Sequence, residues 1–419
     1  MSSLPSTPAQ GLLSRGMAAL LGAQFLSAMA DNLLFVAAIA LLKQTSGGDS
    51  LLLPLLQVAF VLAFILLAPY VGPFADAFSK GRVMFHANLV KLAGAGLILV
   101  GVNPLLGYAV AGVGAAIYSP AKYGILTQLV TQSYLVKANS LLEGSTIAAI
   151  LLGVLAGGWL TDQSVLLAVE VAAGFYLLAA AANLGIPTLP VIRAVSLGDI
   201  RHLPQIFVGN VAVLWRNHDA RFSIMGTSLF WGMGASLRLL MFAWVPAALN
   251  ILDNQAPANL MGLVSIGIVL GAGLAAFLVR VAQVNRALVG GVLLGPLVIL
   301  LAPMHSFEMA AIILVGVGMA GGYFVVPLNA LLQERGHETI GSGRTLAVQN
   351  LFENLAMLGM AGLYFLAVAV GMDSVTVAYG FGGVVTVGMT ALAWGRIRHT
   401  ARIAARAEHT AEGVETVPD

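Results

Sequence analysis

The chain contains twelve apolar stretches of 18 or more residues, separated by short polar turns. A helix needs about 20 apolar residues to cross the ~30 Å hydrocarbon core of a bilayer. Only 9% of the 419 residues are charged, whereas about 25% are charged in soluble domains. Lipid must therefore serve as the solvent of this chain. We expect spanning helices near 17–43, 51–75, 83–102, 104–126, 138–160, 164–186, 221–250, 258–280, 286–303, 307–332, 344–371 and 374–395.

The basic residues are distributed asymmetrically over the predicted turns. With twelve spans, 17 of the 20 Lys and Arg residues fall on one side of the membrane. They are Arg15, Lys80, Arg82, Lys122, Lys137, Arg193, Arg201, Arg216, Arg221, Arg280, Arg286, Arg335, Arg344, Arg396, Arg398, Arg402 and Arg406. Lys43 alone lies on the other side, and Lys91 and Arg238 fall inside spans. Because basic turns stay in the cytoplasm, the pattern predicts two cytoplasmic termini.

The two halves of the sequence look related. Gly112-Val113-Gly114 corresponds to Gly316-Val317-Gly318 at an offset of 204, and Asn139–Glu143 to Gln349–Glu353 at an offset of 210. Six spans per half is an even number, so the halves share one orientation, as in the parallel repeat of the major facilitator fold. We expect an all-α integral membrane protein with two six-helix bundles.

The expected boundaries follow from this repeat. The N-terminal bundle covers 1–186, a cytoplasmic linker 187–220, the C-terminal bundle 221–396 and a cytoplasmic tail 397–419. Within the linker, Leu197–Trp215 has apolar residues at helical spacing, which suits a helix on the membrane surface.

The turn after the second span resembles the major facilitator loop signature G-x-x-x-D-x-x-x-(K/R)-x-(K/R). The matching residues are Gly72, Asp76, Lys80 and Arg82. The glycine would let two helices approach closely, and the charges can pair across the two halves and latch an outward-open state. The run Gly153–Gly158 resembles a second signature of that superfamily but lacks its proline, so we expect it to serve helix packing.

Two opposite charges lie near the middle of the first and seventh spans. Asp31 precedes Asn32 in the first, and Arg238 lies in the seventh. An ionisable residue inside a membrane span marks a functional site by default, because its burial is costly. Our hypothesis is that the guanidinium of Arg238 takes a phosphate while Asp31 orients it or meets a cationic head group. The alternative is a purely structural Asp31–Arg238 salt bridge.

A second polar group is expected nearer the cytoplasmic side. A pair between Lys122 and Glu143 could form a gate or a second head-group station, and the amides of the eleventh span suit hydrogen bonds to glycerol or phosphate. The candidates are Lys122, Glu143, Gln349, Asn350 and Glu353. Lys91 also needs a carboxylate or a cavity, and the sequence does not name its partner.

Several longer stretches resemble one narrower family. They are QFLSAMADNLLF at 24–35, SPAKYGIL at 119–126, KANSLLEGSTIAAILLG at 137–153, TSLFWGMGASLRLL at 227–240 and FVVPLNALLQERG at 324–336. Together they are similar to the bacterial lysophospholipid transporter (LplT) family. The resemblance implies a flippase of the bacterial cytoplasmic (inner) membrane that moves lysophosphatidylethanolamine and lysophosphatidylglycerol from the outer to the inner leaflet. It also implies that an acyltransferase on the cytoplasmic side then reacylates them.

One alternative function remains open and others are disfavoured. A proton-coupled exporter of drugs or small amphipathic solutes would use Asp31 as its carrier acid. A membrane acyltransferase is disfavoured because no His is followed by an Asp five residues later. The chain has no Cys and no His spacing typical of metal sites, and its net charge of +2 does not suggest nucleic acid. We expect no enzyme activity, no metal, no cofactor and a monomer.

Overall fold

The computed structural model describes residues 14–45, 52–130, 135–189, 199–279 and 281–414. Within these ranges, twelve helices are long and apolar enough to cross a membrane, which confirms the predicted all-α, twelve-span fold class. They are α1 (Arg15–Thr45), α2 (Leu52–Ala77), α3 (Lys80–Leu99), α4 (Pro104–Gly124), α6 (Leu135–Gln163), α7 (Val165–Leu184), α9 (His218–Trp244), α10 (Gln255–Leu278), α11 (Leu288–Leu301, preceded without a break by the 3-10 turns of Val281–Ala287), α12 (Phe307–Thr339), α13 (Ser342–Ala369) and α14 (Ser374–Val414). Two shorter helices are α5 (Leu126–Leu129) and α8 (Leu203–Arg216).

Polar side chains begin several of the spans at the predicted turns. Asn103 accepts a hydrogen bond from the amide of Leu105 at 2.9 Å, and Ser164 accepts one from the amide of Leu167 at 3.3 Å. Each bond satisfies one of the free N–H groups in the first turn of a helix. These capping residues explain why the observed helix starts lie close to the predicted ones.

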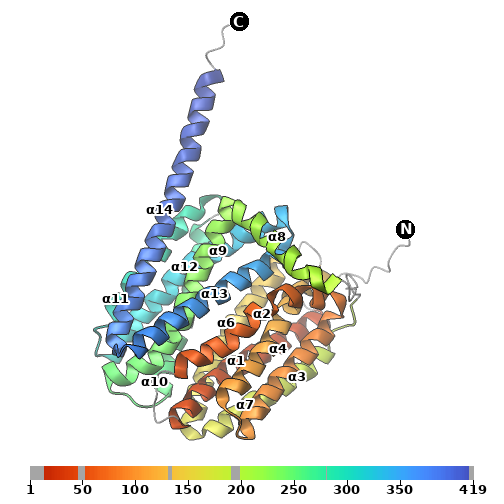
Figure 1. The fold of residues 1–419 in the computed structure, drawn as a ribbon, viewed down its shortest axis with the longest axis vertical. Helices are drawn as coiled ribbons and strands as arrows, with labels where there is room; N and C mark the ends of the chain where they lie inside the picture. The colour runs from red at the N-terminus through yellow and green to blue at the C-terminus, as the bar shows by residue number, and fades with distance from the viewer. Residues whose placement is uncertain (1–13, 46–51, 131–134, 190–198, 280, 415–419) are drawn as a thin grey trace.

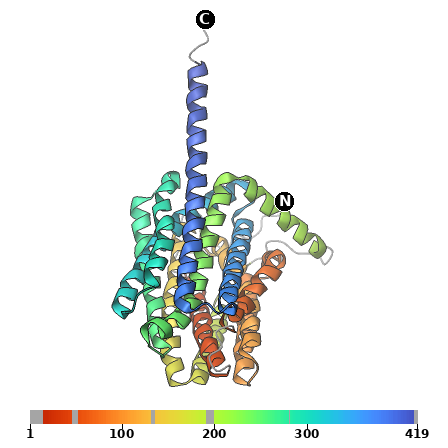
Figure 2. The same ribbon diagram turned by 60° about the vertical axis from the view of Figure 1, so that its left-hand side comes forward.

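Helix α14 continues well beyond the predicted span. The last span was expected to end at residue 395, but the helix continues to Val414 and its 41 residues extend about 60 Å. It projects beyond the bundle at the end where α8 lies (Figures 1 and 2). The segment after residue 395 is rich in Ala, Arg and Glu, which are strong helix formers, so the helix persists after the apolar stretch ends.

The spans pack into two groups. In the first, α1 packs on α6 and α7; in the second, α9 packs on α13, α12 and α14. The groups meet chiefly through α2 with α13 and α6 with α10. The glycine run of α6 lies in these contacts. A Cβ at Gly157 would come within 2.9 Å of Val36 on α1, and one at Gly158 within 2.6 Å of Ala258 on α10. This run therefore packs helices together, as expected.

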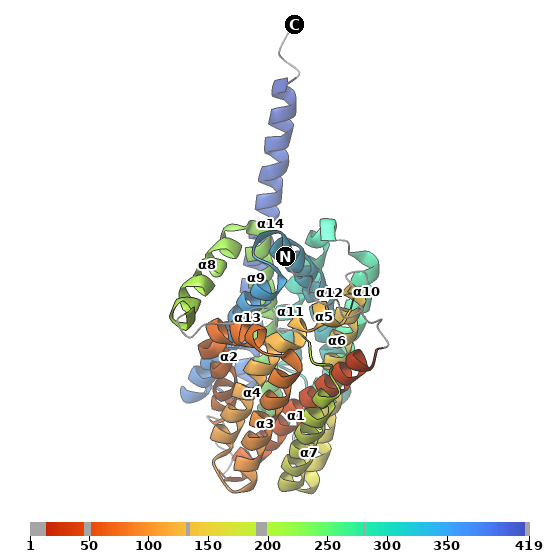
Figure 3. The ribbon, with the colours of Figure 1, turned by 90° about the vertical axis from the view of Figure 1, so that its right-hand side faces the viewer.

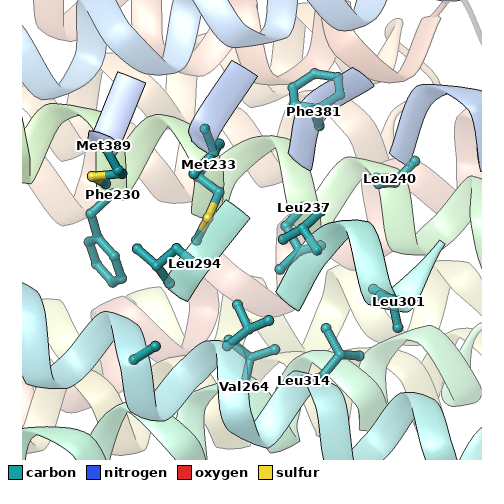
Figure 4. Close-up of a cluster of buried hydrophobic side chains, with 14 of the residues drawn as sticks. Phe230, Met233, Leu237, Leu240, Val264, Leu294, Leu301, Leu314, Phe381 and Met389 are labelled. Atoms are coloured by element: carbon teal, nitrogen blue, oxygen red, sulfur yellow. The ribbon is translucent and has the colours of Figure 1, made fainter. Parts of the chain in front are cut away.

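The core of the second group fixes the position of α9. Phe230, Met233, Leu237 and Leu240 of α9 pack against apolar side chains of α10, α11, α12 and α14 (Figure 4). Burial of each such side chain contributes about 1.5–3 kcal/mol by area, so the α9 face that carries them is firmly held. The side chain of Arg238, on another part of the α9 surface, reaches α1.

Helix α8 lies across one end of the bundle (Figure 3). It contacts both α2 and α13, and Trp215 at its end stacks on Phe352 of α13 with ring centroids 5.0 Å apart. Leu214 is buried, whereas Ile206 and Val208 are exposed. The end of the bundle that carries α8 is called the linker end below, and the opposite end, which carries Lys43, is called the Lys43 end.

Candidate functional site

Asp31 is engaged by two helices of its own group. Its Oδ2 pairs with Lys91 Nζ of α3 at 2.7 Å, and its Oδ1 accepts a hydrogen bond from the Tyr176 hydroxyl of α7 at 2.8 Å. The partner that the sequence could not name for Lys91 is therefore Asp31. Both side chains come from the middle of their spans, where an unpaired charge is costly.

Lys91 is the more deeply buried member of this pair. Its side chain is 2% exposed, against 21% for Asp31. It also donates to Ser27 Oγ at 2.9 Å, and Ser27 in turn donates to Asn88 Oδ1 at 2.7 Å. The ammonium lies 5.0 Å from the ring centroid of Tyr118, close enough for a cation–π contact. This network ties α1, α3 and α7 together and cancels most of the burial cost of both charges.

Arg238 contacts the neighbouring residue on α1. Its Nη1 donates to Asn32 Oδ1 at 2.9 Å, and its guanidinium carbon lies 4.1 Å from the ring centroid of Phe35. The direct Asp31–Arg238 salt bridge, which the sequence offered as the alternative, is not formed. Consecutive residues of a helix point about 100° apart, so Asp31 faces α3 and α7 while Asn32 faces α9.

In the part of the chain that the structure describes, no carboxylate pairs with Arg238. Within the described part of the chain this side chain makes no ion pair, and its hydrogen-bond acceptor is a neutral amide. Asn32 is oriented by its own bond to the Ala28 carbonyl at 2.8 Å. A guanidinium has five donors in a planar fork that matches phosphate and carboxylate groups. The mid-bundle site can therefore accept an anion at Arg238.

A second polar cluster lies closer to the linker end. Gln349 Nε2 donates to Asn329 Oδ1 at 2.8 Å and to Glu353 Oε1 at 2.7 Å. Asn350 Nδ2 reaches Ser119 Oγ of α4 at 3.4 Å, which joins the two helix groups. The structure thus brings the three predicted residues of α13 together with α4, between Arg238 and the linker end.

The predicted gate between Lys122 and Glu143 stays a prediction. Lys122 is buried, at 8% exposure, and its ammonium lies 4.4 Å from the ring centroid of Tyr123. The side chain of Glu143 lies outside the described residues. The backbone places Glu143 early in α6, near the same end of the bundle as Lys122.

The predicted latch is only partly described. Lys80 is buried and runs beside Gly124 of its own helix group, whereas Arg82 is exposed. The side chain of Asp76 lies outside the described residues. A Cβ at Gly72 would meet no atom within 4 Å, so this glycine does not mark a close helix approach in the present conformation. The latch, with the role of Gly72 in it, stays a prediction.

Sequence reasoning missed the supporting side chains of the mid-bundle site. Ser27 precedes Asp31 by four residues and Asn88 precedes Lys91 by three, spacings that place each pair on one helix face. That signal was present in the sequence. The contribution of Tyr176 from α7 had no local signal, because it depends on how two distant spans pack.

The bundle and its charged interior define a membrane transporter of the major facilitator type. The model of the Major Facilitator Superfamily matches residues 20–360. A solved point mutant of the nucleoside transporter NupG superposes with a TM-score of 0.69 at 14% identity, covering 90% of this chain and 98% of that one. The peptide transporter POT in complex with sulfate gives 0.71 at 14% identity, with 94% and 97% covered. At such identities these two structures show the fold alone.

Closer relatives narrow the family. The chain is 53% identical to the lysophospholipid transporter LplT of Klebsiella pneumoniae subsp. pneumoniae, over 92% of this chain and 97% of the relative. It is 50% identical to LplT of Escherichia coli strain K12/DH10B, over 93% and 98%. The chain therefore belongs to the LplT family of major facilitator transporters. It is a multi-pass membrane transporter and not an enzyme.

Proposed function

We propose that this protein flips lysophospholipids, such as lysophosphatidylethanolamine and lysophosphatidylglycerol, from the outer to the inner leaflet. The observation that carries the proposal is the half-buried Arg238 in the middle of the bundle, held by Asn32 and Phe35 and without an anionic partner in the described part of the chain. The names of the relatives supply the substrate class.

The chemistry of the substrate fits this site. A lysophospholipid has one phosphate and one long alkyl chain. Arg238 binds the phosphate through its guanidinium fork, and Asn32 keeps that fork in place. The polar residues Gln349, Asn350 and Glu353 offer hydrogen bonds to the glycerol and the head group on the way to the linker end. The Asp31–Lys91 pair shapes the wall of the site and holds α1 against α3.

Alternating access would come from rocking of two bundles, 1–186 and 221–396, about the linker 187–220. At the Lys43 end, Lys43 Nζ donates to the Phe242 carbonyl at 3.0 Å. The Asp162 carboxylate there accepts from the amides of Asn254 and Gln255 at 3.0 and 3.1 Å. These contacts join the halves and must break when the site opens at that end. In the opposite state, Gly72, Asp76, Lys80 and Arg82 form the latch.

The orientation proposed here puts the linker end in the cytoplasm. This orientation places 17 of the 20 basic residues, the tail 397–419 included, on the cytoplasmic side of a bacterial inner membrane. The flipped lysophospholipid is then available to an acyltransferase on that side. The transporter works as a monomer, because each chain contains a complete pair of bundles.

Uptake by spheroplasts that lack their own transporter tests this function. Wild-type protein should carry labelled lysophosphatidylethanolamine inward, and an uncoupler should leave that uptake unchanged. The alternative, a proton-coupled exporter with Asp31 as carrier acid, requires collapse of transport by the uncoupler. Absence of uptake by protein that is present in the membrane would refute the lipid function.

A further inference from the structure

A groove separate from the mid-bundle site runs between α9, α13 and α14. It encloses about 670 Å³ and its walls are mostly apolar, with Phe222 and Leu229 on α9, Leu355 on α13 and Leu392 on α14. That volume lies within the ~300–1,000 Å³ of typical small-molecule sites. Neither Asp31 nor Arg238 lines it. The groove therefore needs an explanation of its own.

The groove exists because α14 packs loosely over this part of the second helix group. Helix α14 contacts α9 less extensively than its counterpart α7 contacts α1. A Cβ at Gly395 of α14, which lines the groove, would meet no atom within 4 Å. Met225 and Leu355 on the groove are 41% and 40% exposed, so its long side is open toward lipid.

One end of the groove is cationic. Arg221 and Arg396 line this end beside His218, the first residue of α9. Arg396 and Arg335 share the carboxylate of Asp219, and Arg335 also pairs with Glu334 and Glu338, so these two arginines are already engaged. The guanidinium of Arg221 makes no hydrogen bond or ion pair within the described ranges of the chain. The ring of His218 stacks on that of His399, with centroids 3.4 Å apart. This end of the groove thus presents the Arg221 guanidinium with its donors unused.

The length of the groove matches one leaflet. Along α9 it extends from His218 to Leu229, a rise of about 16 Å. Half of a ~30 Å hydrocarbon core is about 15 Å. An acyl chain that begins at the cationic end would therefore run through one leaflet beside the helices. Ser228, near the inner end of the groove, is the exception to its apolar walls.

We propose that the groove holds one acyl chain of an anionic diacyl phospholipid from the leaflet at the linker end, with the phosphate bound by Arg221. The open side lets the second acyl chain remain in the bilayer. This lipid is not the transported substrate, because the groove shares no side chain with the Arg238 site. It stabilises the contact of α14 with α9 and α13 while the transporter cycles.

Native mass spectrometry of the purified full-length protein tests this site, with phosphatidylglycerol added in a zwitterionic detergent. Wild type should bind one phosphatidylglycerol saturably and more tightly than phosphatidylcholine. Arg221→Gln removes a charge-assisted hydrogen bond and should weaken binding about tenfold. Gly395→Leu fills open space in the groove and should weaken it at least as much. Ala391→Leu serves as a second blocking variant if the first does not fold.

Two matched variants are controls. Arg216→Gln removes an exposed charge at the end of α8, and Gly380→Leu adds a side chain to α14 in open space away from the groove, so both should bind as wild type does. If Gly395→Leu and Ala391→Leu bind normally, the lipid is attracted to the charged surface only and the proposal is wrong. Equal binding of phosphatidylcholine would overturn the anionic site. Displacement of phosphatidylglycerol by equimolar lysophosphatidylethanolamine would instead make the occupant a single-chain lipid and overturn the diacyl assignment.

Discussion

The pairing of Asp31 with Lys91 makes a quantitative prediction about stability. Removal of one member of a buried ion pair costs about 3–5 kcal/mol, because the other charge stays buried alone. Lys91 is 2% exposed, whereas Asp31 is 21% exposed and keeps its bond from Tyr176. We therefore expect Lys91→Met to cost about 3 kcal/mol, at the lower end of that range. Asp31→Asn should cost more, because it leaves the less accessible charge unpaired.

The double variant distinguishes the energy of the Asp31–Lys91 interaction from the separate effects of the two side chains. Asp31→Asn with Lys91→Met leaves no charge at this place, and replacement of a buried pair by neutral groups is often close to neutral. The free energy of unfolding, measured by tryptophan fluorescence during SDS titration in mixed micelles, should therefore recover to within about 1 kcal/mol of wild type. The two substitutions should therefore show a coupling of about 5 kcal/mol or more. Additivity within about 0.5 kcal/mol would refute the ion pair.

Three further predictions concern packing, gating and topology. Gly153→Leu would overlap the Met29 carbonyl and Asn32, and should cost about 1–3 kcal/mol and reduce transport; unchanged thermal stability would contradict this. Since the chain has no Cys, single cysteines report accessibility directly. Ala258 is buried at the Lys43 end, so Ala258→Cys reports whether this end opens. Its reaction with a maleimide should be several-fold faster when Asp162→Ala removes two hydrogen bonds between the halves. An equal rate would contradict closure of the Lys43 end by these bonds. A cysteine introduced by Arg402→Cys should be labelled only from the cytoplasmic side. If an impermeant reagent labels it in intact cells, the C-terminal tail lies outside and the proposed orientation is wrong.

The twelve spans were predictable from the sequence because they depend on local signals. Span length follows from bilayer thickness, and a cap such as Asn103 is visible beside the span that it begins. The observed helix bounds accordingly lie within a few residues of the predicted ones for most spans. Hydropathy placed the end of the last span at residue 395 but not the end of the helix at Val414, because hydropathy reports where the apolar stretch ends.

The pairing inside the bundle was not predictable in the same way. The sequence placed Asp31 and Arg238 at similar depth, but depth does not decide which face of a span a side chain occupies. If α1 were turned about its axis by the angle between consecutive residues, Asp31 and Asn32 would exchange their positions. The packing of α3 and α7 against α1 decides which of the two faces Lys91 and which faces Arg238. Lys91 could have been considered as a partner of Asp31 because both are charges in the first helix group. The choice between Lys91 and Arg238 required the tertiary structure.

The central claim is that Arg238 binds the phosphate of the transported lipid, and transport by Arg238 variants tests it most directly. Initial uptake of labelled lysophosphatidylethanolamine should fall by a factor of about 10–100 in Arg238→Ala, since a charge-assisted hydrogen bond contributes about 1.5–3 kcal/mol. Arg238→Lys keeps the charge but loses the fork, so its uptake should be intermediate. Equal membrane levels of the variants control for folding. Uptake by Arg238→Ala at the wild-type rate would contradict the claim, because it would show that Arg238 does not bind the phosphate during transport.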